Sequence, residues 1–135
     1  MPDTFQFEIV TPDRLVVKDS AEEMEIPGKT GYLGILPGHA PLITELGVGE
    51  ITYRSANVTH RFAVAWGFAE VLPDKVTIMA ETVERPTEID VERAQKAKAR
   101  AEQTLKAAAE NTDYPRTLDS LKRAENRIDV AAKKD

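Results

Sequence analysis

Residues 84–94 read ERPTEIDVERA, and this stretch divides the chain into two parts of different character. All seven glycines of the 135 residues precede it, together with most of the prolines and aromatic residues, and no glycine follows it. Glycine is common in turns and unfavourable inside helices. We therefore expect a β-rich domain over residues 1–85 and a helical domain over residues 86–135.

The first part shows the alternation that is typical of half-buried strands. In residues 4–9 every odd position is apolar and every even position is polar, and residues 58–66 and 75–78 alternate in a similar way. Turn-forming pairs such as Pro27-Gly28 and Pro73-Asp74 separate these runs. Short strands divided by frequent turns predict an antiparallel sandwich or barrel.

The second part has the pattern of two antiparallel helices. The first is expected from Asp90, a good N-cap, to about Glu110, and the second continues to about Lys133. Residues 111–115, NTDYP, interrupt the pattern, and so short a connection makes a hairpin. The expected inward stripes are Val91, Ala94, Ala97, Ala101, Leu105 and Ala108, and Leu118, Leu121, Ala124, Ile128 and Ala131.

These stripes consist largely of alanine, so the hairpin buries little apolar surface by itself. We expect that it needs the β domain, a ligand or a partner to hold it, and that it can move.

Charge and composition exclude several classes of protein. Residues 1–86 carry 7 basic and 13 acidic side chains, which argues against nucleic acid as a partner. No apolar run approaches the roughly 18 residues of a membrane span. The two histidines, His39 and His60, lie in a turn and on a strand face, and no Gly-x-Ser-x-Gly elbow is present. An enzyme that handles nucleotides on its own remains an alternative, but it would lack a base and a nucleophile.

The placement of arginines in the hairpin is unusual. Arg93 and Arg100 are seven positions apart and share a helix face, about 10 Å apart along the axis. Arg123 and Arg127 are one turn apart on the second helix. Folding the hairpin at its break brings Arg100, Arg123 and Arg127 to one level.

Few acidic residues are within reach of these arginines along the helices. Arg93 has Asp90 and Arg123 has Asp119 at suitable spacing, but no acid lies three or four positions from Arg100 or Arg127. Such a group of donors suits a phosphate chain. The alternative interpretation is a charged face exposed to solvent.

Several motifs together resemble the ε subunit of bacterial F-type ATP synthases, and the resemblance spans essentially the whole chain. They are IVTP at 9–12, GYLGILPGHAPL at 31–42, GFAEV at 67–71, KVTI at 75–78 and IDVERA at 89–94. The last is similar to an Ile/Leu-Asp-x-x-Arg-Ala motif for ATP binding. Two places depart from the pattern: Ala65-Trp66-Gly67 stands where paired glycines are usual, and Pro115 opens the second helix.

The resemblance implies an N-terminal antiparallel β-sandwich of about ten strands followed by a C-terminal two-helix antiparallel hairpin. The sandwich would lie at the foot of the central stalk, against the γ subunit and the c-subunit ring, in a rotor that couples proton flow to ATP synthesis. The protein would be a non-catalytic, peripheral subunit at the cytoplasmic face of the bacterial plasma membrane. Extended toward the α and β catalytic subunits, the helix pair would inhibit ATP hydrolysis; folded down, it would bind ATP.

Carried over by motif, the resemblance implies a nucleotide site with an adenine side and a phosphate side. The adenine side would be Glu84, Ile89, Asp90 and Ala94, and the phosphate side would be Arg93, Arg100, Arg123 and Arg127. ATP would be a regulatory ligand rather than a prosthetic group, and phosphates and water would hold any magnesium. The alternative is the same rotor subunit without a working nucleotide site, its arginines docking on the catalytic subunits.

Overall fold

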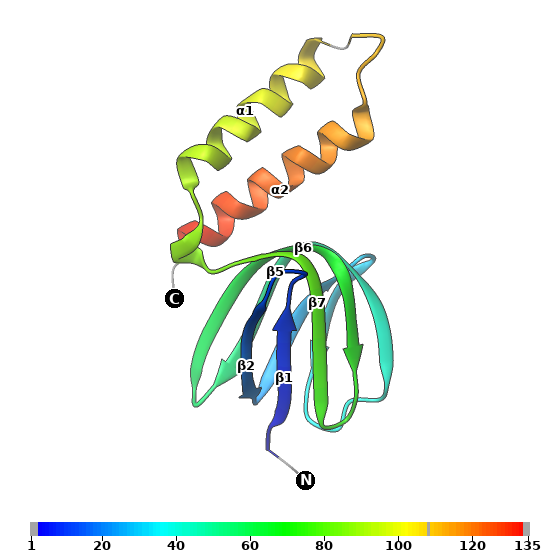
Figure 1. Cartoon of the computed structure of the whole chain (residues 1–135), viewed down its shortest axis with the longest axis vertical. Coiled ribbons are helices and arrows are strands. Elements are labelled where there is room, and N and C mark those ends of the chain that lie inside the picture. Colours follow the sequence, from blue (N-terminus) through cyan, green and yellow to red (C-terminus); the bar gives the residue numbers. More distant parts are fainter. Residues whose placement is uncertain (1–2, 108, 134–135) are drawn as a thin grey trace.

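The computed structural model describes residues 3–107 and 109–133, and it places seven strands before two helices (Figure 1). The strands are β1 (Phe5–Val10), β2 (Leu15–Ala21), β3 (Glu23–Gly28), β4 (Gly31–Ile35), β5 (Leu42–Ser55), β6 (Val58–Val71) and β7 (Lys75–Glu84). A 3₁₀ turn, η1 (Pro86–Glu88), leads into α1 (Val91–Ala107), and α2 (Tyr114–Lys133) follows. The break between the helices overlaps the predicted one at 111–115, but α1 is described to Ala107 rather than to about Glu110, and α2 already begins at Tyr114.

The strands hydrogen-bond in the order β2-β1-β7-β6-β5-β3-β4, and the sheet curves over its own core to give the expected sandwich (Figure 1). The described residues form seven strands rather than about ten. Part of the difference arises from β5 and β6, which are 14 residues long and continue through Gly47 and Trp66, where the pairing is interrupted and then resumes in the same register. Each therefore serves both layers as one strand. All neighbours are antiparallel except β1 and β7, which run parallel.

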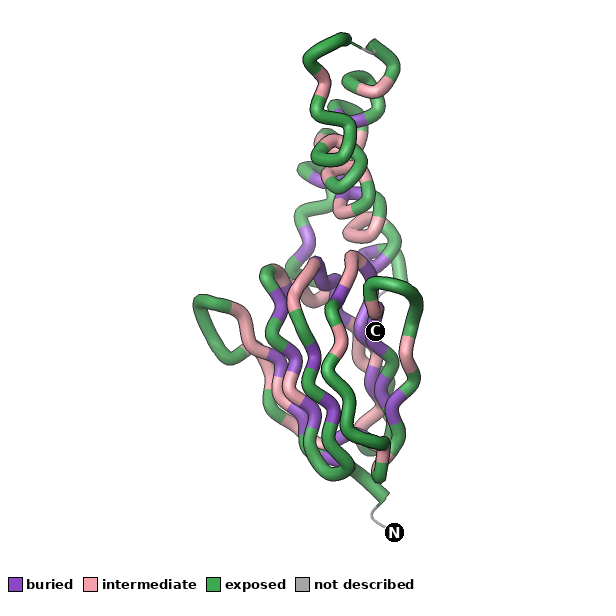
Figure 2. The backbone as a smooth tube through the Cα atoms, turned by 90° about the vertical axis from the view of Figure 1, so that its right-hand side faces the viewer, coloured by how far each residue is buried: buried purple, intermediate pink, exposed green. Residues whose placement is uncertain are grey.

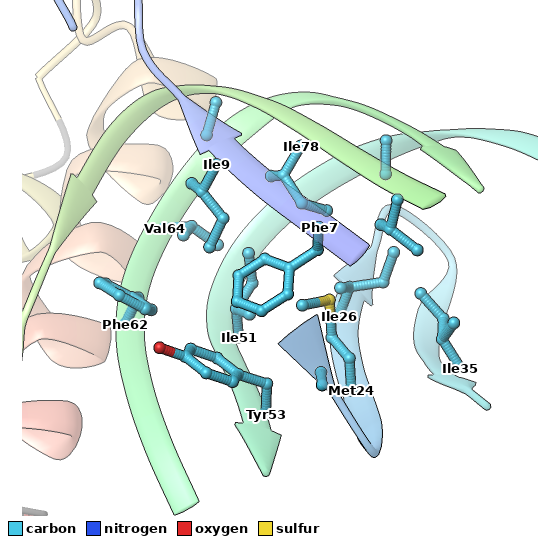
Figure 3. Packing of buried hydrophobic residues seen from close by; sticks show 14 of the residues in the cluster. Phe7, Ile9, Met24, Ile26, Ile35, Ile51, Tyr53, Phe62, Val64 and Ile78 are labelled. Atoms are coloured by element: carbon cyan, nitrogen blue, oxygen red, sulfur yellow. The ribbon is translucent and has the colours of Figure 1, made fainter. Parts of the chain in front are cut away.

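The alternating residues of the first part build the core of the sandwich (Figure 3). Phe7 and Phe62 are fully buried, and Tyr53 lies between them, with ring centroids 4.5 and 6.1 Å away. His60 stacks on Tyr53 at 4.8 Å, so it packs against the core as its strand position predicts. The turn after Ser55 uses Ala56 and Asn57 at positive φ, which matches the twist of a tight hairpin.

The hairpin stands at one end of the sandwich, and α2 makes its contacts with β5 and β6 (Figure 1). The two helices pack through small residues, with Ala94, Ala101 and Ala124 buried. Most of the hairpin is exposed or half-buried (Figure 2), as its alanine-rich stripes predict. Neither helix of the described chain is long and apolar enough to cross a membrane.

Two residues of the expected inward stripes are exposed instead. Leu118 is 52% exposed and Val91 is 38% exposed, so the prediction that they face inward is wrong. Leu118 belongs to the first turns of α2, which begins at Tyr114. The tip of the hairpin extends away from the sandwich (Figure 1). Ala108, also assigned to a stripe, lies outside the described residues. In contrast, Val130 is fully buried because the last turns of α2 lie on the sandwich.

Candidate functional site

Two aspartates begin the two helices. The Asp90 carboxylate accepts a hydrogen bond from the Arg93 amide at 3.0 Å, which confirms the predicted N-cap of α1. Asp113 accepts one from the Arg116 amide at 3.1 Å and caps α2 in the same way. Because the helices are antiparallel, α1 begins at the sandwich and α2 begins at the tip.

A cleft of about 590 Å³ lies between the helices, and we call it the interhelical cleft. Its walls carry five arginines, two from α1 and three from α2, and small residues separate them. The arginines are Arg93, Arg100, Arg116, Arg123 and Arg127. Since both helices contribute, the cleft exists only while the hairpin is closed on itself.

The structure brings most of the predicted nucleotide-site residues together in this cleft. Its lining includes Glu84, Asp90, Arg93, Ala94, Arg100, Arg123 and Arg127. Ile89 does not line the cleft. It is 7% exposed and belongs to a small cluster with Ala63, Val130 and Ala131, where it helps to fix α2 on β6.

Arg116 also lines the cleft, in addition to the four arginines predicted there. Its spacing in the sequence carries a signal for this position. Arg116, Ser120, Arg123 and Arg127 follow one another at spacings of three or four residues, which places them on one face of α2. The position of Arg116 in the cleft therefore follows from helical spacing alone.

Arg127 has an acidic partner from outside the hairpin. Its Nε donates to Oε1 of Glu84, the last residue of β7, at 2.6 Å, and both side chains are about 30% exposed. As the spacing predicts, no acidic residue of α2 pairs with Arg127; its partner Glu84 lies 43 positions away, on the sheet. The pair ties α2 to the end of β7 and leaves the remaining Arg127 donors at the cleft.

Arg123 does not use Asp119 as its spacing suggests. Its guanidinium lies over the ring of Trp66, 5.0 Å from the centroid, and its Nε is buried without a hydrogen-bond partner. Asp119 lines a different groove, beside Phe68 and Met79. Asp90 likewise receives the backbone amide of Arg93 and serves as a cap.

The charges of the cleft are arranged along its length. Its three carboxylates, Glu84, Glu88 and Asp90, all precede α1 in sequence and so lie at the end next to the sandwich. The arginines extend from this end to Arg116 in the first turns of α2. Five cations against three acids give the lining a positive balance, which favours an anion with several charges.

Contacts between α2 and the sandwich hold the hairpin down, and we call them the docking contacts. Glu50 is 8% exposed and binds two cations, Arg61 of β6 and Lys133 of α2, each at 2.7 Å. The side-chain amide of Asn126 donates to the Gly49 carbonyl at 2.9 Å. Lys133 and Asn126 thus attach α2 to two successive residues of β5.

Burial alone would raise the pKa of Glu50, but the hydrogen bonds from Lys133 and Arg61 outweigh it and hold the pKa below its ordinary value of 4.5. Glu50 therefore stabilises the docked hairpin fully above pH 4.5. This contribution is lost as the pH falls below 4.5 through the folded-state pKa.

We expect Glu50→Gln to reduce the free energy of unfolding by about 1–2 kcal/mol, because it leaves two cations without their carboxylate. Urea unfolding measures the loss, and hydrogen exchange of residues 126–131 locates it at the docking contacts. The matched control is Glu45→Gln, which breaks an exposed pair with Lys29 and should cost at most about 0.5 kcal/mol. Equal effects of the two substitutions would contradict a special role for Glu50.

The described residues contain no group of three or more histidine, cysteine, aspartate or glutamate side chains placed to hold a metal ion. What the cleft offers a ligand is guanidinium donors along its length and carboxylate acceptors at one end.

Family models for two domains match the chain in succession. One, described as "ATP synthase, Delta/Epsilon chain, beta-sandwich domain", matches residues 4–86. The other, described as "ATP synthase, Delta/Epsilon chain, long alpha-helix domain", matches residues 87–132.

Several curated relatives are named ATP synthase epsilon chain. That of Koribacter versatilis is 72% identical over 108 residues, which are 80% of this chain and 76% of the relative. That of Halalkalibacterium halodurans is 45% identical over 131 residues, 96% of this chain and 98% of the relative. That of Solibacter usitatus is 41% identical over 134 residues and covers 99% of this chain and 100% of the relative.

Solved structures of ATP synthases contain chains of the same fold. One from the Euglena gracilis mitochondrial ATP synthase, described as OSCP/F1/c-ring in rotational state 1, superposes with a TM-score of 0.83. It is 20% identical and covers 93% of this chain and 80% of that chain. One from the central stalk and c-ring of the Tetrahymena thermophila enzyme gives a TM-score of 0.61 at 13% identity, with 96% and 94% covered. At these identities the likeness shows the fold.

Proposed function

Because this chain belongs to the epsilon-chain family of the F-type ATP synthases and is a non-catalytic subunit of the stalk, we propose that its hairpin is a nucleotide-controlled regulator. In this proposal ATP binds in the interhelical cleft and favours the hairpin that is docked on the sandwich. The observation that carries the proposal is the convergence of five arginines from two helices on one cleft.

The distribution of charge along the cleft supports ATP as the ligand. The carboxylates at the sandwich end, Glu84 above all, can accept from the amino group of adenine, and Ala94 offers an apolar contact to the ring. A phosphate chain directed toward the tip would then pass the arginines of both helices. ATP carries one more phosphate than ADP and so engages more of them, which predicts a preference for ATP.

Binding can control the hairpin through a population shift. ATP has a complete site only when both helices face each other, so it stabilises the docked state by its differential affinity. At an ATP concentration ten times Kd this stabilisation is about 1.4 kcal/mol. Since the docked hairpin rests on few contacts, a change of this size is enough to alter its population by about tenfold.

We place the extended hairpin along the γ subunit, toward the α and β subunits, where it hinders ATP hydrolysis. Tyr114 and Leu118 near the tip are 41% and 52% exposed and offer apolar surface for such contacts. The exposed side chains Leu36, Leu42 and Leu72 lie near the beginning of β7, at the end of the sandwich opposite the hairpin. The Gly38 amide donates a hydrogen bond to the Pro73 carbonyl there. We assign that end to the c-subunit ring, at the cytoplasmic face of the bacterial membrane.

The test uses the assembled ATP synthase and Arg100→Ala, because Arg100 lines the cleft and has no carboxylate partner within the described residues. If ATP holds the hairpin down, the substitution weakens ATP binding and leaves more of the subunit extended. At ATP concentrations that relieve the unsubstituted enzyme, hydrolysis by the variant should be at least about twofold slower.

The alternative, in which the arginines dock on acidic surfaces of the catalytic subunits, predicts the opposite sign. Arg100→Ala would then weaken the inhibitory contact, and hydrolysis would be faster than in the unsubstituted enzyme. Arg54→Ala is the matched control, since Arg54 pairs with Glu22 and Glu23 on the sandwich, away from the hairpin. It should leave hydrolysis unchanged.

A further inference from the structure

Trp66, the chain's single tryptophan, occupies a backbone position that disfavours it. Its φ is +54°, in the left-handed region that a bulky side chain rarely adopts. The position is the bend of β6, between Ala65 and Gly67, which keep their pairing with β7. Glycine would adopt this conformation without strain. A tryptophan in this strained conformation indicates that its side chain makes an interaction that offsets the strain.

The indole ring meets a residue of the interhelical cleft. The guanidinium of Arg123 lies over it at 5.0 Å from the centroid, which is the geometry of a cation–π contact. Because Trp66 belongs to β6 and Arg123 to α2, the contact joins the sandwich to the hairpin. Arg123 also lines the cleft, so the same guanidinium is shared between ring and cleft.

The other partners of Arg123 are few. Its Nε is buried and has no hydrogen-bond partner, and no carboxylate in the described chain pairs with it. The ring therefore fixes the guanidinium without neutralising it or using its N–H donors. Glu84 pairs with Arg127, whereas a carboxylate at Arg123 would fix that arginine but would compete with an incoming phosphate.

We propose that Trp66 is a positioning residue for the nucleotide site. Its ring orients the Arg123 guanidinium so that the N–H donors can bind a phosphate. Because the ring belongs to the sandwich, this orientation exists only while the hairpin is docked. The inference rests on the proposed function and deepens it. When α2 leaves the sandwich, Arg123 loses the ring and the site loses a preorganised donor.

The test compares Trp66→Gly and Trp66→Phe in the full chain by ATP calorimetry and urea unfolding. Trp66→Gly relieves the strain of the positive φ but removes the contact with Arg123, so these opposing effects should leave the free energy of unfolding within about 1 kcal/mol of the unsubstituted chain. The variant should nevertheless bind ATP roughly five- to tenfold more weakly. Trp66→Phe keeps an aromatic face and should bind within about threefold of the unsubstituted chain. Phe68→Ala is the control, since Phe68 is exposed on the same strand and does not line the cleft.

Tryptophan fluorescence distinguishes a positioning role from a merely structural one, because only a residue coupled to the site should respond to ATP. ATP should change the emission of Trp66 with the same midpoint as the calorimetric titration, and Arg123→Ala should abolish that change at saturating ATP. Equal ATP affinity in Trp66→Gly and the unsubstituted chain would overturn this inference alone. Absence of ATP binding by the unsubstituted chain would overturn the proposed function together with it.

Discussion

Replacing Arg100 and Arg127 together by alanine should lower the affinity for ATP by about 100-fold or more, because each guanidinium supplies charge-assisted hydrogen bonds worth about 1.5–3 kcal/mol. The two residues come from opposite walls of the interhelical cleft. Removing Arg127 also breaks its pair with Glu84 at 2.6 Å, so the contact between α2 and the end of β7 beside the cleft is lost as well. Calorimetric titration of the variant against the unsubstituted chain measures the loss.

The controls separate loss of the site from loss of the fold. Arg54→Ala removes a paired arginine of the sandwich and should leave ATP affinity unchanged. Arg100→Lys keeps the charge without the planar fork, so it should fall between alanine and arginine. An affinity within threefold of the unsubstituted chain in the double alanine variant would show that the nucleotide lies elsewhere.

Gly67→Ala should destabilise the sandwich by about 3–5 kcal/mol, since two unfavourable effects coincide at this residue. An added Cβ would lie 2.0 Å from the Met79 carbonyl oxygen and 2.8 Å from the Ala80 Cα, both in the backbone of β7. The φ of Gly67 is +131°, which an alanine rarely adopts. Relief requires β6 and β7 to separate at the bend beside Trp66.

The comparison for Gly67→Ala is Gly34→Ala, on the edge strand β4. A Cβ at Gly34 would meet nothing within 4 Å, and its φ is not in the left-handed region. This substitution should change the free energy of unfolding, measured in urea, by less than about 1 kcal/mol. Equal tolerance of the two substitutions would show that the close approach of β6 and β7 at Gly67 does not constrain the fold.

Local patterns predicted the elements of the fold well, because alternation in residues 4–9 and the capping aspartate at 90 act over a few residues. The seven strands differ slightly from the roughly ten that the resemblance implies. Gly47 and Gly49 are typical of a turn, yet both lie inside β5. Whether such glycines end a strand or only interrupt its pairing depends on packing between the two layers, which no local pattern contains.

The candidate site was only partly accessible to the same reasoning. Helical spacing brings Arg93 to Arg100 and Arg123 to Arg127, and the structure places all four in one cleft. The partners of Arg127 and Arg123 lie on β7 and β6, so no pattern within a helix could identify Glu84 or Trp66. Ile89 lies in an apolar cluster with Val130 and Ala131 of α2, a contact that no pattern within residues 84–94 could predict.

ATP sensing by the interhelical cleft is tested most directly by calorimetric titration of the unsubstituted chain with ATP, and in parallel with ADP. We predict one ATP bound per chain and a clearly weaker interaction with ADP, since the third phosphate engages further arginines of the interhelical cleft. Failure to bind either nucleotide, or equal affinity for both, would contradict the assignment of the cleft as an ATP-sensing site.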